Sequence, residues 1–322
     1  MKQSLLQRLL EPGQLSARFQ PIFRFSGKVN QVHALEALVR GPSGTNFEGA
    51  DVLFDYVRRK KAEAKVDRAC IATICAAAAA LPSNFRLNIN VHALTLGESP
   101  DFAVFLQKET AKHSLAMHRL TVEIVEHAPT RNIPAMLATI AALRDFGVRI
   151  ALDDVGLGQS NYRMMLDCHP DYFKLDAYFV QGLCVDQKRR AVVESLVTLA
   201  DALDSSVVGE GAESLGDLGA LEQLGVELVQ ANILCPPMPA EDLLATGLLQ
   251  SGLVEFDATL QAGAAQAGVN QAGVNQAGVN QACANQAGAN QPREKPAAGT
   301  NPGQVERKEP ARVVALPAAH SM

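Results

Sequence analysis

Short apolar runs recur through the first 250 positions of the chain, and helical patterns separate most of them. Runs rich in β-branched and aromatic residues, each bounded by polar or turn-forming residues, predict strands. They cover 19–23, 32–39, 85–91, 119–124, 148–153, 172–175, 206–208 and 227–229. Between two of these runs, Asn132 as a cap, Pro134 in the first turn and Gly147 after the last turn bound an amphipathic helix.

Strands that alternate with helices at this spacing predict a parallel sheet, because each crossover helix returns the chain to the same end of the sheet. Eight such strands in about 240 residues are typical of a closed, TIM-like (β/α)8 barrel. We therefore expect an α/β fold in which residues 1–15 form a short N-terminal segment and residues 16–250 form the barrel.

The last part of the chain has a different composition. The pentapeptide Gln-Ala-Gly-Val-Asn begins at Gln266, Gln271 and Gln276, and a segment containing several prolines follows. A period of five is too short for a solenoid of supersecondary units. One valine per repeat also buries too little apolar surface to offset the entropy of ordering. Residues 251–322 are predicted to be a disordered tail, and the sequence names no partner for it.

The charge balance narrows the classes of ligand. A net charge of −5 and a pI near 5.8 provide no basic field to hold long nucleic acid, so a phosphate ligand would be held locally. The longest apolar stretch, 70–81, is shorter than the roughly 20 residues that span a bilayer, and no leader pattern opens the chain. We expect a cytoplasmic protein that contacts no membrane.

Acidic and amide residues stand at or just after the predicted strand ends, where a TIM-like barrel carries its active site. They are Glu36, Asn90, Glu123, Asp153, Asp154, Asp176, Glu210 and Gln230, and the basic Lys174 stands among them near the end of the sixth predicted strand. One buried carboxylate is usually part of a salt bridge, but several that converge at one mouth repel each other and require cations. Hard oxygen ligands without a nearby His or Cys favour Mg²⁺ or Mn²⁺, and two such ions suit displacement at phosphorus.

Seven short motifs occur together and in order, and through them the chain resembles the EAL-domain family of cyclic di-GMP phosphodiesterases over roughly residues 16–245. They are Gln-Pro-Ile at 20–22, Glu-Ala-Leu-x-Arg at 36–40, Glu-x-x-Glu at 123–126, Asp-Asp-x-Gly-x-Gly at 153–158, Lys-x-Asp at 174–176, Glu-Gly-x-Glu at 210–213, and Gln230.

The resemblance implies a modified barrel whose first strand is antiparallel to the others, and hydrolysis of cyclic di-GMP to linear pGpG by two Mg²⁺ or Mn²⁺ ions. It implies that the metal ligands are Glu36, Asn90, Glu123, Asp153, Asp154 and Glu210. Lys174 would orient the attacking water, and Gln20, Arg40 and Gln230 would contact the dinucleotide. Glu126 would anchor the loop after the fifth strand, with Asp176 and Glu213 in support. The family also implies a homodimer.

The loop after the fifth strand departs from the family pattern. Val155, Leu157, Gln159 and Asn161 stand where Phe, Thr, Tyr and Ser are usual. An active hydrolase is the leading interpretation. A receptor that binds cyclic di-GMP and signals through a protein partner is the alternative, and an interaction module on a degenerate barrel is the third. His92 and Asp67, which lie near the motifs, are interpreted as structural residues.

Overall fold

The computed structural model describes residues 4–26, 29–125, 132–157, 161–251, 253–256 and 313–315. Its eight barrel strands coincide with the eight predicted ones. They are β1 (Ser16–Ser26), β2 (Val29–Arg40), β3 (Arg86–His92), β4 (Leu120–Val125), β5 (Arg149–Val155), β6 (Tyr172–Leu175), β7 (Ser206–Glu210) and β8 (Leu228–Gln230).

The strands close into a barrel in which only β1 runs against the others. Strands β2 to β8 pair in sequence order and are parallel, whereas β1 pairs antiparallel with both β2 and β8. The expected TIM-like barrel with an antiparallel first strand is confirmed. Because of this direction, Ser16 at the start of β1 lies opposite Arg40 at the carboxyl end of β2.

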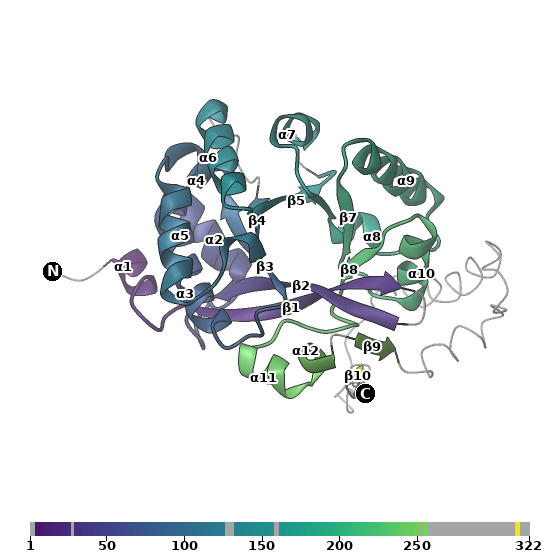
Figure 1. Ribbon diagram of the computed structural model, residues 1–322, viewed down its shortest axis with the longest axis horizontal. Coiled ribbons are helices and arrows are strands. Elements are labelled where there is room, and N and C mark those ends of the chain that lie inside the picture. The colour runs from purple at the N-terminus through teal and green to yellow at the C-terminus, as the bar shows by residue number, and fades with distance from the viewer. Residues whose placement is uncertain are drawn as a thin grey trace, which may run out of the picture.

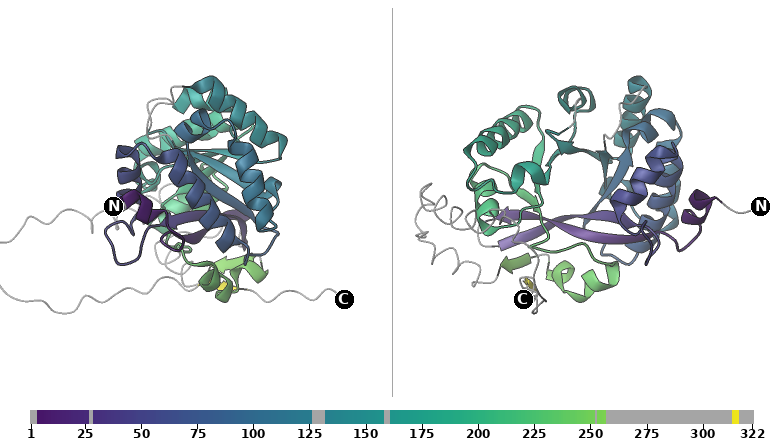
Figure 2. Two further views of the ribbon diagram at one scale, coloured as in Figure 1. Left: turned by 90° about the vertical axis from the view of Figure 1, so that its left-hand side faces the viewer. Right: turned by 180° about the vertical axis from the view of Figure 1, so that it is seen from behind.

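Helices surround the strands on the outside (Figures 1 and 2). On one side lie α2 (Ala50–Arg59), α3 (Glu63–Ala78), α4 (Ala93–Glu98), α5 (Phe102–Lys112) and α6 (Ile133–Asp145). On the other lie α7 (Asn161–Cys168), α8 (Ala177–Val180), α9 (Gln187–Ala202) and α10 (Leu215–Gln223). The remaining elements are α1 (Leu5–Leu9), the 3₁₀ turn η1 (Met117–Arg119), α11 (Ala240–Ala245) and α12 (Leu248–Ser251).

Alternation along each strand divides the barrel residues between two environments. Outward-facing side chains such as Phe173 and Ile89 pack with the helices in one large apolar core. The inward-facing side chains include a separate small apolar cluster, formed by Ile22, Ala34, Ala151, Tyr172, Val208 and Leu228. The next inward position toward the mouth is therefore two residues along each strand from this cluster, and that is where the polar motif residues occur.

Two features of the sheet lie outside the predicted set. Strands β1 and β2 are 11 and 12 residues long and extend past the barrel (Figure 1). There β9 (Leu253–Phe256) pairs antiparallel with Val29–Gln31, and β10 (Val313–Ala315) pairs with β9. Both short strands fall within 251–322, the range predicted to be disordered. The repeat itself lies outside the described residues.

Among the described residues, no helix combines the length and the apolar character that a membrane crossing requires.

We expect that a chain ending at residue 256 keeps the barrel, because β10 pairs with β9 and with no barrel strand. The midpoint temperature should fall by less than about 4 °C, the shift expected for at most 1 kcal/mol. Thermal unfolding followed by circular dichroism measures it. A second chain ending at residue 238 also loses α11, which contacts β1 and buries Leu243, and should unfold at a clearly lower temperature. Equal losses in both chains would contradict the expectation.

Candidate functional site

The inward positions above the apolar cluster bring together one polar residue from every strand. They are Gln20 (β1), Glu36 (β2), Asn90 (β3), Glu123 (β4), Asp153 (β5), Lys174 (β6), Glu210 (β7) and Gln230 (β8). Each stands two residues along its strand from an inward residue of the layer below, as Glu36 does from Ala34 and Lys174 from Tyr172. The closed sheet thus gathers side chains that are up to 210 positions apart in the sequence.

Lys174 lies at the centre of this ring and is only 1% exposed. Its Nζ is 2.7 Å from Glu123 Oε2, 2.7 Å from Glu210 Oε1, 3.2 Å from Glu36 Oε2 and 3.4 Å from Asp153 Oδ1. One ammonium therefore faces four carboxylates. The ring has a surplus of negative charge when all of these carboxylates are ionised.

Side-chain amides hold two of the carboxylates in place. Asn90 Nδ2 donates to Glu36 Oε1 at 2.7 Å, and Gln230 Nε2 donates to Glu36 Oε2 at 2.8 Å. Gln230 Nε2 also donates to Gln20 Oε1 at 2.8 Å. Glu123 is held from the layer below, where Asn88 Nδ2 donates to its Oε1 at 2.7 Å. The orientation of the carboxylates is thus fixed by neutral donors as well as by the ammonium.

Backbone distortions position the two aspartates near the carboxyl end of β5. The pairing of β5 with β6 shifts between Leu152 and Val155, so Asp153 and Asp154 lie in an irregular segment. Asp154 has φ of 51°, in the left-handed region that few residues adopt without strain. Gly156 has φ of 101°, and a Cβ there would lie 2.6 Å from the ring of Phe179. Only glycine fits this position, which places the end of β5 against α8.

Burial and mutual repulsion set the pKa values in the ring. Burial raises the pKa of Glu123 well above its usual range, and the neighbouring Glu36 raises it further. Burial likewise raises the pKa of Glu210 to about 8 and that of Asp154 to about 6. Burial also raises the pKa of Glu36, but the charge of Lys174 and the hydrogen bonds from its two amide donors lower that pKa overall. The surrounding carboxylates outweigh burial at Lys174 and raise its pKa.

The donor set fits divalent cations. Carboxylate and amide oxygens are the ligands that Mg²⁺ and Mn²⁺ prefer, and the surplus negative charge requires a counter-ion. Asp153 Oδ1 and Glu210 Oε1 are buried and face the ammonium of Lys174 at 3.4 Å and 2.7 Å, and no other hydrogen-bond donor reaches them among the described residues, so each has further coordinating capacity. Within the described part of the chain, no group of three acidic, His or Cys side chains is already arranged to hold a metal ion. The reason is that the carboxylates converge on the ammonium of Lys174.

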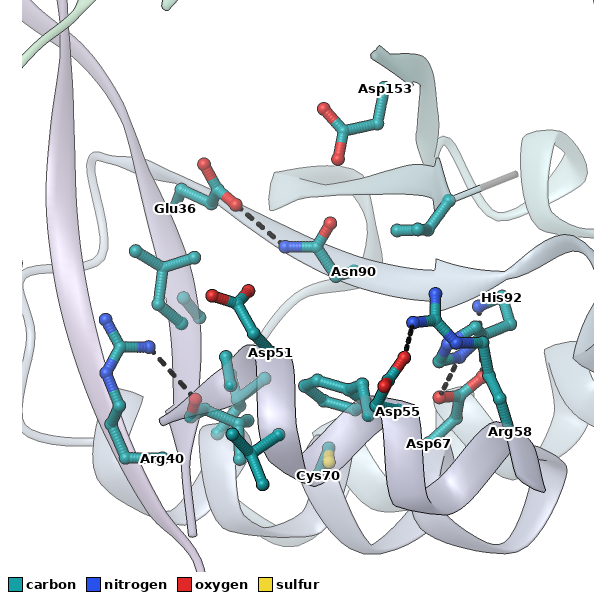
Figure 3. A pocket seen from close by; sticks show the side chains of 18 residues that line it. Glu36, Arg40, Asp51, Asp55, Arg58, Asp67, Cys70, Asn90, His92 and Asp153 are labelled. Atoms are coloured by element: carbon teal, nitrogen blue, oxygen red, sulfur yellow. Dashed lines mark hydrogen bonds and ion pairs between the residues drawn. The ribbon is translucent and has the colours of Figure 1, made fainter. Parts of the chain in front are cut away.

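Two pockets open at the ring. One of about 270 Å³ is lined by residues of β1, β2, β5, β6, β7 and β8, among them Gln20, Glu210 and Gln230. The other, of about 500 Å³, lies between β2, β3 and the helices α2 and α3. In Figure 3, Glu36, Asn90 and Asp153 border this larger pocket on one side, and Asp55, Arg58, Asp67 and His92 lie toward its other end.

The other predicted site residues lie at varied distances from the ring. Arg40 ends β2, is partly buried and lines the larger pocket. Asp176 lines the smaller pocket and caps α8 by accepting from Tyr178 N at 2.7 Å. Glu213 is exposed and accepts from Gln181 Nε2 at 3.1 Å. Glu126, the expected loop anchor, and Gln159 lie outside the described residues.

Near the ring, Asp67 makes three hydrogen bonds to neighbouring residues. Asp67 accepts from the backbone N–H of His92 at 3.0 Å, pairs with His92 Nδ1 at 2.8 Å and accepts from Thr95 Oγ1 at 2.5 Å. These hydrogen bonds support the structural role expected for Asp67 and His92. Asn88 was not among the predicted residues, although the inward alternation of β3 that selects Asn90 also selects Asn88.

The fold and this ring define a member of a single family. A family model described as EAL domain matches residues 3–237, and the chain belongs to that family. A cyclic di-GMP phosphodiesterase of Escherichia coli, PdeR, is 27% identical over 240 residues, which are 73% of this chain and 36% of that protein. NbdA of Pseudomonas aeruginosa, also a cyclic di-GMP phosphodiesterase, is 26% identical over 239 residues, 73% of this chain and 30% of that protein.

Solved structures share the architecture. The manganese and cyclic di-GMP complex of Klebsiella pneumoniae BlrP1 superposes with a TM-score of 0.64 at 26% identity, covering 71% of this chain and 57% of that one. The PaMucR phosphodiesterase in complex with cyclic di-GMP gives a TM-score of 0.63 at 24% identity, covering 71% of this chain and 99% of that one. The chain spans about a third of the length of the two curated relatives described above.

The raised carboxyl pKa values predict how pH couples to metal binding. Glu210 and Asp154 keep protons in the folded, metal-free protein up to about pH 8 and about pH 6, whereas the unfolded chain loses them near pH 4. These two groups therefore make the folded state less stable as pH rises through that window. A divalent ion held by these two groups would have to displace the same protons, so its binding would strengthen over the same range.

We expect the increase in midpoint temperature caused by Mg²⁺ to be larger at pH 8 than at pH 6. Thermal unfolding at both values, with Mg²⁺ or with a chelator, measures this difference. Glu210→Gln should reduce the pH dependence, because it removes the carboxyl group with the higher of the two raised pKa values. The same Mg²⁺ effect at pH 6 and pH 8 in the unsubstituted protein would contradict the electrostatic account.

Asn88→Ala should lower the free energy of unfolding by about 1–3 kcal/mol, the cost of leaving the buried Glu123 Oε1 without its donor. Denaturant titration gives the value. Asn84→Ala, at an exposed position just before β3, is the matched control and should change the stability by less than about 0.5 kcal/mol. A loss no larger than the control's would show that Asn88 does not hold Glu123.

Proposed function

We propose that this chain hydrolyses cyclic di-GMP to linear pGpG with the help of two divalent ions. The observation that carries the proposal is the buried ring of four carboxylates around Lys174 at the carboxyl ends of the parallel strands. A ring with this charge is costly to keep unless cations and an anionic substrate use it. Membership of the family, and the activity named for PdeR and NbdA, support the same conclusion.

The residues proposed to hold the ions, Mg²⁺ or Mn²⁺, are Glu36, Asn90, Glu123, Asp153, Asp154 and Glu210. The bound ions would neutralise charge that develops on the phosphoryl oxygens and favour attack by water at phosphorus. Glu36 and Asn90 are already joined by a hydrogen bond, and Asp153 lines the same pocket (Figure 3). Asp176 and Glu213 are proposed to support the smaller pocket rather than to bind ions.

Lys174 is the proposed catalytic residue. Its ammonium reaches all four carboxylates, so it can donate a hydrogen bond to a water held among them and orient that water toward phosphorus. Its raised pKa keeps it protonated, which makes it a donor rather than a base. Gln20, Arg40 and Gln230 are proposed to contact the dinucleotide, and the pocket of about 500 Å³ beside Glu36 offers space for one base.

A receptor for cyclic di-GMP that does not turn it over is the alternative. The convergence of the carboxylates on Lys174, rather than on an ion position, is the observation that favours it. For this chain a cytoplasmic location, a homodimer through the altered loop after β5 and the boundaries 16–250 for the catalytic unit remain predictions. Measuring both binding and hydrolysis distinguishes the two functions.

The purified protein should convert cyclic di-GMP to pGpG with Mg²⁺ or Mn²⁺ and not with a chelator present, as followed by chromatography. Lys174→Met should lower turnover by at least about 100-fold, the usual contribution of a positioned proton donor, while binding of cyclic di-GMP changes far less. Lys188→Met, at an exposed position on α9, is the matched control and should behave like the unsubstituted protein.

Binding of cyclic di-GMP without product under all metal conditions would favour the receptor. Absence of both binding and product would contradict the proposed function. Equal losses of affinity and turnover in Lys174→Met would make Lys174 a substrate-binding residue instead.

A further inference from the structure

A small cavity lies inside the barrel, beneath the ring of carboxylates. Lys174 lines it from the side of the mouth, and Tyr172, two residues earlier on β6, lines it from the apolar layer. Asn88 of β3 and Thr121 of β4 line it as well. These two residues are direct neighbours across the parallel pair of strands, so both inward side chains reach the same space. Thr121 has no part in the motifs or in the proposed mechanism.

Asn88 and Thr121 each bring to this cavity a buried polar atom that receives no hydrogen bond. Asn88 is 4% exposed and Thr121 is 0% exposed. The Asn88 amide donates through Nδ2 to Glu123 Oε1, so its Oδ1 is turned away from Glu123. Among the described residues, neither this Oδ1 nor Thr121 Oγ1 has a hydrogen-bond partner. Because a buried amide oxygen or hydroxyl without a partner destabilises a fold, native structures usually supply one, often as an ordered water.

Size and charge together select the ligand. The cavity volume of about 10 Å³ is close to the least that holds one water molecule, and it excludes a phosphate or any larger anion. Lys174 and Arg86 both line the cavity, and their positive charges disfavour a metal cation there. Water is neutral, and it can donate to an amide oxygen while it bonds to a hydroxyl. A buried water needs at least two polar partners, and Asn88 and Thr121 provide them.

We propose that Asn88 and Thr121 bind one buried water molecule beneath the ring, and that this water makes Thr121 a positioning residue for Glu123. The water donates one hydrogen to Asn88 Oδ1 and accepts the hydroxyl hydrogen of Thr121. With Oδ1 held in this way, Nδ2 of Asn88 faces Glu123. A rotated amide would present Oδ1 to the carboxylate, and the two oxygens would repel each other. The water site stands by itself, whereas its effect on metal binding rests on the proposed function, which assigns Glu123 to an ion.

Thr121→Val tests the water site, because valine keeps the shape of threonine and removes the hydroxyl. Thr139→Val is the matched control, since it removes a buried hydroxyl of α6 that bonds directly to the carbonyl of Leu96 at 2.9 Å. Crystal structures of the full chain should show water within hydrogen-bonding distance of Asn88 and Thr121 in the unsubstituted protein, and the same water in Thr139→Val. The water should be lost in Thr121→Val, because one polar partner does not retain it. A cavity without water in the unsubstituted protein, or water that remains in Thr121→Val, overturns the site.

Binding of Mn²⁺, measured by calorimetry without any dinucleotide, tests the positioning role. Thr121→Val should weaken this binding about ten-fold relative to Thr139→Val, a usual effect of losing an interaction that orients a metal ligand. Thr121→Ser keeps the hydroxyl and should retain the affinity of the unsubstituted protein. Equal affinities in Thr121→Val and Thr139→Val overturn the positioning role. If the water is present but the unsubstituted protein does not bind Mn²⁺, the proposed function fails and the water site stands.

Discussion

The charge balance around Lys174 is the constraint on which the rest of the site depends. A buried ammonium is costly without partners, and so is each buried carboxylate, so neither set could occupy the barrel alone. Together they satisfy the ammonium completely and the carboxylates only in part, since four negative groups share one positive one. The raised pKa values of Glu123 and Glu210 express this deficit. The protein folds with the deficit in place, and the proposed cations would offset it.

The barrel makes this arrangement simple to encode. Each strand presents one inward residue to the lower layer, which is apolar on six strands and holds Asn88 and Thr121 on β3 and β4, and, two residues toward the mouth, one polar residue to the ring. Lys174 follows Tyr172 and Glu210 follows Val208 by this rule. Because the rule depends only on strand periodicity, the strands and most of the ring could be predicted from the sequence once the eight apolar runs were recognised. The boundaries of β3 to β8 differ from the prediction by at most two residues.

Other features depend on contacts that periodicity does not report. Alternation along β3 places Asn88 inward, but it does not show what the side chain contacts. Only the hydrogen bond to Glu123 shows its role. Gln20 is brought to the mouth by the direction of β1, which the family resemblance implied but which no pattern within β1 reveals. The extension of β2 past the barrel pairs with β9, which lies more than 200 residues away in the sequence. Such long-range pairings are set by tertiary structure, not by local propensity.

The reversed first strand also determines where the polypeptide enters the barrel. In an all-parallel barrel the chain would arrive at the face opposite the active site. Here Ser16 lies opposite Arg40, so the residues that lead into β1 arrive on the same side as the substrate mouth. A movement of the backbone just ahead of β1 therefore needs to travel only a few residues to displace Gln20. Any signal delivered through the N-terminal junction has direct mechanical access to the ligand, without passing through the core.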